Sequence, residues 1–418
     1  MYNKKVLDRV ALFVWITLIL VSGVKQTIAS IFSSVGYFLI SYLLFFYFLL
    51  VYGKRKNRNG VNIYPFLLFL FIYTFLLQFY SQGGISYVSM GVKFHLYVWN
   101  LITTIPCYFS ALCILRYSDE QDFYFIKKAA MWELLILAIS TISILSVDPM
   151  AAKLTAVGGH ESEYFLLMGY GIIYGLACIM PLLFWNAQGY NKKILPLCFV
   201  LLLCLCVLNA SYTIAILGGV VGLGVYLILR IKDRGLKFIL IITVLLVFVW
   251  LLFTDGMALI LEYLAAKIPL EEVSKRFEQI AVALRTGETY DTTVRFDLYI
   301  ESLDFFIRHP IIGNVIVDGT SSSMWGHSTN LDILAGFGII VFGLYLSLPI
   351  NVFRYNYNVN DGLRFKSAVI SMFIVFLFLS TFNPILSGTE IISMFILAPA
   401  VISSRKINNE KNITSSSL

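Results

Sequence analysis

The sequence has few charged residues: Asp, Glu, Lys and Arg make up 13% of its 418 residues, whereas 59% are hydrophobic. Soluble globular domains carry about 25% charged residues, so this composition excludes an ordinary water-soluble enzyme. Phe and Tyr are abundant, with 34 and 25 copies, which is typical of lipid-facing helices and of the aromatic belts at their ends. The sequence therefore predicts an integral membrane protein.

Residues that hold metals or form disulfides are also scarce. The four histidines (His95, His160, His309 and His327) are scattered, so no metal site is expected. All six cysteines fall in apolar stretches, which argues against a disulfide framework or a zinc site. Walker A, dinucleotide-binding and His-Glu-x-x-His motifs are absent from the sequence, so ATP-driven transport and metalloprotease chemistry have no support and no cofactor is expected. No repeat at a fixed period is visible, which weakens an inverted-repeat transporter.

The sequence does contain twelve apolar runs, and a membrane span takes about 20 such residues. The runs are roughly 8–24, 29–52, 61–80, 94–115, 129–147, 164–187, 194–209, 212–229, 238–254, 331–350, 367–383 and 389–404. They predict an all-α, polytopic membrane helix bundle of about 12 spans. The predicted parts are spans 1–9 (residues 1–254), a large extracytoplasmic loop (255–330), spans 10–12 (331–404) and a cytoplasmic tail (405–418).

The basic residues give the predicted orientation. Of the 31 Lys and Arg residues, 22 fall in the N-terminus, the tail and the connections on one side, and three fall in the short connections on the other. Because cytoplasmic loops are rich in Lys and Arg, both ends are expected in the cytoplasm, in a multi-pass protein of the inner (cytoplasmic) membrane. The net charge of +7 is therefore an insertion signal, and no nucleic-acid partner is expected.

The long segment 255–330 differs from every other connection. It carries six basic and eleven acidic residues, a net charge of −5. About seventy-five residues are too many for a linker and few for an independent domain. Two or three short helices packed over the mouth of the bundle are expected.

Within that segment, the stretch from Asp291 to Pro310 predicts a helix that Thr292 or Thr293 caps and Pro310 ends. At roughly 100° per residue, Arg295 shares one side of this helix with Tyr299, Ser302 and Phe306. The acidic residues Asp297, Glu301 and Asp304 lie on the opposite side, together with Arg308. An arginine without a carboxylate partner on its own helix is available for a ligand, although it could also extend toward the membrane interface.

His327 directly precedes the tenth apolar run, so it is predicted at the outer mouth of the bundle. A histidine there can take a proton near neutral pH or donate a hydrogen bond to phosphate. A structural histidine at the interface is the alternative. Asp332 lies near the same end and is a candidate contact for an acceptor sugar.

These residues occur in a recognisable order: Arg295, then His309-Pro310-Ile-Ile-Gly313, then Gly326-His327, then a leucine-rich run with Gly336 and Gly338. The order, together with the long outer loop, resembles the Wzy-type polymerase and O-antigen ligase superfamily. The signature covers about 45 residues, and hydropathy carries the rest of the resemblance.

The resemblance implies a membrane glycosyltransferase of GT-C-like fold, which joins glycans carried on undecaprenyl pyrophosphate. Its partners would be the lipid-linked donor and acceptor, the membrane lipid and a chain-length regulator. Arg295 would neutralise the departing pyrophosphate through bidentate contacts, and His327 would act as general base or phosphate contact. Tyr299 and Asp332 are the further substrate contacts predicted.

Two features depart from the family pattern. Ser328 follows the histidine where many relatives have Asn, and no arginine occurs near Asn209–Thr213, where many relatives have one. If a second arginine binds phosphate, Arg276 and Arg285 are the candidates.

Three functions stay open on this sequence. The first is a polymerase that joins oligosaccharide repeat units of O-antigen or capsule. The second is an O-antigen ligase that transfers glycan to lipid A core. The third, of another class, is a flippase or transporter of lipid-linked oligosaccharide, which should carry more charge within its spans and lack a large outer loop.

Overall fold

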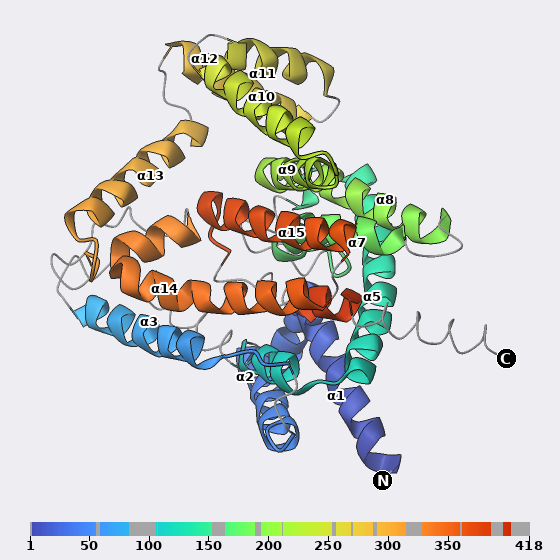
Figure 1. The fold of residues 1–418 in the computed structure, drawn as a ribbon. Helices are drawn as coiled ribbons and strands as arrows, with labels where there is room; N and C mark the ends of the chain where they lie inside the picture. Colours follow the sequence, from blue (N-terminus) through green and yellow to red (C-terminus); the bar gives the residue numbers. More distant parts are fainter. Residues whose placement is uncertain are drawn as a thin grey trace.

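The computed structural model describes residues 2–55, 59–82, 106, 108–152, 164–188, 194–210, 212–252, 256–268, 271–286, 291–314, 328–359, 362–385 and 396–402. Regular structure in these residues is helical throughout and includes no strand, which confirms the all-α class. The labelled helices are α1 (Tyr2–Leu20), α2 (Ser22–Tyr52), α3 (Tyr64–Gln82), α5 (Glu120–Val147), α7 (Tyr170–Ala187), α8 (Ile194–Asn209), α9 (Thr213–Leu229), α10 (Arg234–Leu252), α11 (Gly256–Lys267), α12 (Glu271–Thr286), α13 (Asp291–Arg308), α14 (Thr329–Asn358) and α15 (Leu363–Phe382). Figure 1 shows their arrangement.

The helices follow the apolar runs of the sequence. Every run that lies mainly within the described residues falls on a helix, and the runs 94–115 and 389–404 are described only in part. Four helices are long and apolar enough to cross a membrane, namely α5, α7, α14 and α15. Shorter apolar helical stretches occur at Leu39–Tyr52, Tyr64–Tyr73, Ile194–Asn209 and Thr213–Leu229. The chain is thus a multi-pass membrane protein.

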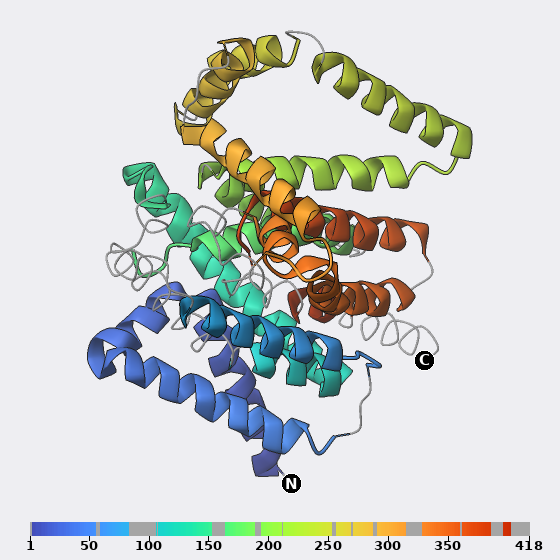
Figure 2. The ribbon, with the colours of Figure 1, turned by 90° about the vertical axis from the view of Figure 1, so that its left-hand side faces the viewer.

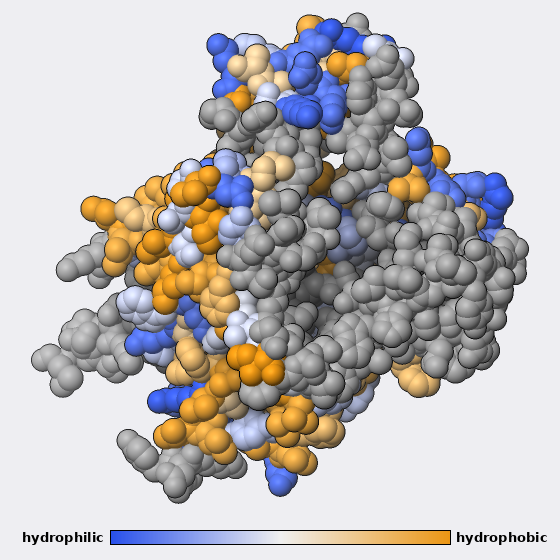
Figure 3. Space-filling model, turned by 180° about the vertical axis from the view of Figure 1, so that it is seen from behind, coloured by the Kyte–Doolittle hydropathy of each residue, from blue (hydrophilic) through white to orange (hydrophobic). Residues whose placement is uncertain are grey.

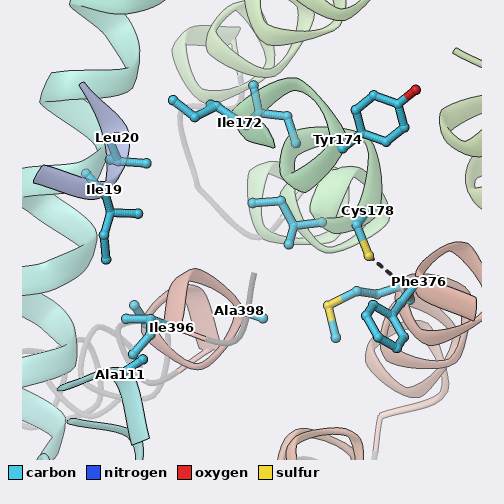
Figure 4. Close-up of a cluster of buried hydrophobic side chains, with 14 of the residues drawn as sticks. Ile19, Leu20, Ala111, Ile172, Tyr174, Cys178, Phe376, Ile396 and Ala398 are labelled. Carbon is cyan, nitrogen blue, oxygen red and sulfur yellow. Dashed lines mark hydrogen bonds between the residues drawn. The ribbon is translucent and has the colours of Figure 1, made fainter. Parts of the chain in front are cut away.

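Helix α15 packs in the centre of the bundle, against α7, α9 and α14. Small residues allow this packing: a Cβ on Gly222 of α9 would lie within 3.0 Å of Val375 on α15, and the Ser371 hydroxyl donates a hydrogen bond to the Gly222 carbonyl. Lipid tails are as apolar as the side chains, so burial of apolar surface does not drive helices together in a membrane. Close approach at small residues stabilises their association instead. Figure 4 shows the neighbouring core, where the Cys178 thiol of α7 donates to the Met372 carbonyl at 3.2 Å.

An ionic cluster joins the first helices of the chain. Arg55, just after α2, contacts Asp8 of α1 at 2.9 Å and Asp122 of α5 at 2.6 Å. The Tyr47 hydroxyl donates to Asp8 at 2.6 Å, and the Arg55 guanidinium lies 3.9 Å from the centre of the Tyr52 ring. The Asp8 side chain is 8% exposed, so Arg55 neutralises a carboxylate that water barely reaches.

Helix α3 contacts α14 through aromatic rings, although the two are far apart in sequence. The ring centres of Phe69 and Tyr345 are 5.5 Å apart, and those of Tyr73 and Phe337 are 5.1 Å apart. Tilted pairs at these distances are favourable beyond the area that they bury. The last third of the chain is thus packed onto the first.

Three helices, α11, α12 and α13, occupy the segment for which the sequence predicts two or three. Helices α11 and α12 pack on each other as a hairpin, whereas α13 packs on α14. In Figure 1, α13 stands at the end of the bundle where α14 begins and runs across the direction of α14, and Figure 2 shows this end face-on. On the face shown in Figure 3, hydrophilic side chains gather over the α11–α12 hairpin, while hydrophobic ones cover much of the described part of the bundle.

Helix α14 is broken at Gly338, whereas the sequence predicts one unbroken span over 331–350. Gly338 has φ 73° and ψ −177°, so a short helix, 329–337, and a longer one, 339–358, meet there at a kink. The longer part has 20 residues, which span about 30 Å at 1.5 Å per residue, the thickness of a bilayer core. The short part is buried at most positions. Helix α14 therefore contains the whole predicted span and is apolar on both sides of the break, but it has a kink that the sequence does not predict.

Candidate active site

Two glycines allow the chain after α13 to pack against the break in α14. Gly313 has φ 72° and Gly338 has φ 73°, values that side chains strongly disfavour. A Cβ on Gly313 would lie within 3.0 Å of backbone atoms of Gly336 and Phe337, and a Cβ on Gly338 within 3.0 Å of the Ile311 backbone. Both positions therefore require glycine for conformation and for space.

Backbone hydrogen bonds hold the two segments together. The Asn314 N–H donates to the Ala335 carbonyl at 2.9 Å, and the Ile339 N–H donates to the Pro310 carbonyl at 2.8 Å. These bonds use a carbonyl and an N–H that the break removes from the helix ladder, and an unpaired group there would be costly in an apolar setting. We call this contact of residues 310–314 with 335–339 the glycine junction.

The glycine junction attaches the end of α13 to α14, and α13 packs on its neighbours with one side. Ser302 is 3% exposed. Tyr299 donates a hydrogen bond to the Phe382 carbonyl at 3.0 Å, and its ring contacts the Phe382 ring edge-on. Asp297 and Asp304 are exposed on the other side. This matches the division of the helix expected from the sequence.

The first turn of α14 is capped by its own residues. Ser328 is buried, and its hydroxyl accepts a hydrogen bond from the Leu331 N–H at 3.1 Å. Asp332 is 6% exposed and accepts from the Ser328 N–H at 3.4 Å. A carboxylate in this turn also interacts favourably with the positive end of the helix dipole. Asp332, predicted from the sequence as a sugar contact, thus stabilises the start of α14.

A buried amide connects the start of α14 with the end of α15 and the start of α7. Asn383 is 1% exposed; its carbonyl accepts from the Thr329 N–H at 3.1 Å. Its side chain accepts from the Tyr170 hydroxyl at 3.0 Å and donates to the Tyr174 hydroxyl at 2.9 Å. No motif in the sequence marks Asn383, Tyr170 or Tyr174 as functional. The one local signal is Pro384, which predicts the end of the helix at Asn383 without indicating a partner.

Two buried amide oxygens, one in the glycine junction and one at the start of α14, have no hydrogen-bond partner among the described residues. Asn314 is 1% exposed and its Oδ1 has no partner there; the same holds for Oδ1 of Asn330, which is 6% exposed. The Asn330 amide donates to the Thr381 hydroxyl at 2.9 Å. A buried acceptor without a partner costs about 1–3 kcal/mol. Both oxygens are therefore candidates to accept a hydrogen bond from a hydroxyl group of a bound molecule.

The predicted cationic residues are described to different extents. His327 lies outside the described residues, next to the described Ser328. The backbones of Arg295 and Arg276 belong to α13 and α12, but their side chains lie outside the described part. Position 295 is four residues before Tyr299, one helical turn away on the same side of α13.

Arg285 already has a partner. Its two terminal nitrogens contact the two Glu262 oxygens at 2.8 and 3.0 Å, within the α11–α12 hairpin. This ion pair neutralises the arginine and keeps it in the hairpin. The structure therefore places Tyr299 against Phe382 at the end of α15 and Asp332 in the first turn of α14, whereas Arg285 is paired within the α11–α12 hairpin. Among the described residues, no group of three or more His, Cys, Asp or Glu side chains could hold a metal ion.

No protein-family model matches this chain, and no curated protein matches it either.

Proposed function

We propose that this protein is a membrane glycosyltransferase that polymerises a surface polysaccharide, O-antigen or capsule, from repeat units linked to undecaprenyl pyrophosphate. The proposed architecture is a GT-C-like bundle of about 12 spans in the inner (cytoplasmic) membrane. Both ends of the chain lie in the cytoplasm, and the glycine junction lies on the outer face. A chain-length regulator is a further proposed partner.

The glycine junction is the observation that carries the proposal. The family resemblance rests on several short motifs, and two of them are hydrogen-bonded to each other. These are the Pro310–Gly313 stretch and the run that contains Gly338. The helix that contains Arg295 and the helix that begins just after His327 are thereby parts of one unit, to which Tyr299 and Asn383 add contacts with α15 and α7. Such convergence of distant segments is what a shared active site requires.

The proposed chemistry needs one cation and one base. An acceptor hydroxyl attacks the anomeric carbon of the donor, a new glycosidic C–O bond forms, and the bond to the pyrophosphate oxygen breaks with its electron pair leaving on the phosphate. Arg295 neutralises that charge through planar hydrogen bonds, and His327 takes the hydroxyl proton. The unpaired oxygens of Asn314 and Asn330 are suited to accept sugar hydroxyls.

Deletion of the gene, followed by electrophoresis of the surface glycan, tests this function. Loss of a polymerase leaves single repeat units attached to the surface, whereas loss of a ligase leaves polymer on its lipid carrier and bare core. Loss of a flippase leaves neither form on the surface. Glu133, on the candidate span α5 and hydrogen-bonded to Thr17 at 2.6 Å, is the described feature that favours a transporter, because ionisable groups within spans are often functional.

Substitutions test the site within that function. Arg295→Ala and His327→Ala are each expected to abolish polymer while the protein still inserts into the membrane. Arg308→Ala is the matched control, because Arg308 is on the same helix but is exposed and pairs with Asp304 at 2.6 Å. Normal chain lengths in the Arg295 and His327 variants would contradict the assignment.

A further inference from the structure

Helix α13 has a second surface, which is neither charged nor packed on the bundle. Ile300, Leu303 and Ile307 lie on it at 65%, 42% and 72% exposure. Their spacing of three and four residues places them in one row along the helix. Exposed aliphatic side chains in such a row mark a surface that another apolar material covers.

The row continues past the end of α13 and onto α14. Ile311 and Ile312 in the glycine junction are 60% and 47% exposed, and Ile339 and Ile340 of α14 are 50% and 58% exposed. The Ile339–Pro310 hydrogen bond holds these two parts beside each other. We call these seven residues, Ile300, Leu303, Ile307, Ile311, Ile312, Ile339 and Ile340, the aliphatic stripe.

The aliphatic stripe ends on α14, a helix that can span the membrane. Ile339 directly follows the break in α14, a helix that over Thr329–Asn358 is long and apolar enough to cross a membrane. The exposed side chains of Ile339 and Ile340 therefore belong to the surface that α14 presents to lipid. Since the stripe on α13 is continuous with that surface, the same material is expected to cover both.

The charges of α13 lie along a neighbouring side of the helix. Asp297, Asp304 and Arg308 are exposed and follow one another at intervals of seven and four residues, and Arg308 pairs with Asp304. A helix that carries an apolar row beside a charged row is suited to the plane of a membrane surface, with one side in hydrocarbon and the other in water. The crossing of α13 over the direction of α14 agrees with this orientation (Figures 1 and 2).

We infer that α13 is an in-plane membrane helix whose aliphatic stripe is covered by the acyl chains of the bilayer leaflet in which the longer part of α14 begins. Its charged row faces water, and the side with Tyr299 and Ser302 faces the bundle. This lipid contact is independent of the glycosyl transfer proposed above.

Nitroxide labels on single introduced cysteines test the inference in the full-length protein, in nanodiscs of phosphatidylcholine. The native cysteines are replaced, and labels are placed on the stripe (Leu303→Cys, Ile307→Cys) and on the charged row (Asp297→Cys, Asp304→Cys). Lipid contact predicts more frequent collisions with oxygen than with a water-soluble nickel complex for both stripe labels, and the reverse for both charged-row labels.

Either of two other results would overturn it. Frequent nickel collisions at 303 and 307 would show that water covers the stripe. Immobilised labels that neither reagent reaches would show that protein covers the stripe. The same measurement in discs that hold one molecule each would then show whether that protein is another segment of the same chain or a second copy. If the cysteine-free variant does not fold, a benzophenone amino acid is placed at position 303 or at position 304 of the protein with its native cysteines. Lipid contact then predicts cross-linking to lipid from position 303 and none from position 304.

Discussion

Replacement of Gly338 by alanine is the sharpest test of the glycine junction. The backbone there lies at φ 73° and ψ −177°, in a region that is essentially restricted to glycine and costs other residues about 1–3 kcal/mol. The added Cβ would also approach the Ile311 backbone closer than real contacts allow. That backbone cannot rotate away as a flexible side chain could, so the loop has to move.

Movement of the loop removes the hydrogen bond from Ile339 to Pro310. A buried N–H left without a partner costs about 1–3 kcal/mol, so Gly338→Ala is expected to lose about 2–6 kcal/mol in total. Gly343→Ala is the matched control on the same helix, because a Cβ at Gly343 meets nothing within 4 Å. Alanine has the higher helix propensity, so this variant should be as stable as the parent or slightly more so.

Thermal unfolding in detergent micelles, followed by loss of the monodisperse peak in size-exclusion chromatography, measures both variants. Gly338→Ala should unfold at a clearly lower temperature than Gly343→Ala, and Gly313→Ala should behave like Gly338→Ala. Equal unfolding temperatures for the two α14 variants, with unchanged glycan product, would refute the role assigned to the junction.

Three further substitutions test contacts elsewhere in the structure. Arg55→Gln leaves two aspartates without their cation and should cost about 1–3 kcal/mol, measured by thermal unfolding against the exposed control Lys54→Gln; an equal effect of both would contradict the ionic cluster. Gly222→Val should destabilise the packing of α9 on α15 by about 1–3 kcal/mol through overcrowding, whereas Gly224→Val, at a position with nothing within 4 Å, should not, and similar unfolding temperatures would count against close packing. Arg285→Gln should keep polymer length normal on glycan gels, because Glu262 already neutralises this arginine; loss of polymer would instead place Arg285 in the site.

Local patterns in the sequence predicted much of the fold. Hydropathy indicated the helices because an apolar run of about 20 residues has few other structures available in lipid. The segment from Asp291 to Pro310 was expected as a helix, and α13 ends at Arg308. The buried position of Ser302 and the exposure of Asp304 follow from helical periodicity alone.

The break in α14 could not be predicted in the same way. Glycine within an apolar run is compatible with a continuous helix, and hydropathy carries no information on φ. The conformation of Gly338 depends on Pro310 and Ile311, whose backbone occupies the space at the break. For the same reason the hydrogen bonds of Asn383 with Tyr170 and Tyr174 had no local signal: they join residues more than 200 positions apart.

The ionic cluster at Arg55 has a consequence for the order in which the chain assembles. Its contacts span 47 residues to Asp8 and 67 residues to Asp122, so α1, α2 and α5 can join while most of the protein is still unsynthesised. The contact of α3 with α14 forms much later, because it requires Tyr345, which is made after four fifths of the chain. The contact of Phe66 on α3 with Tyr108 can form early, so the docking of α3 is completed in two stages, and its contact with α14 is the late one.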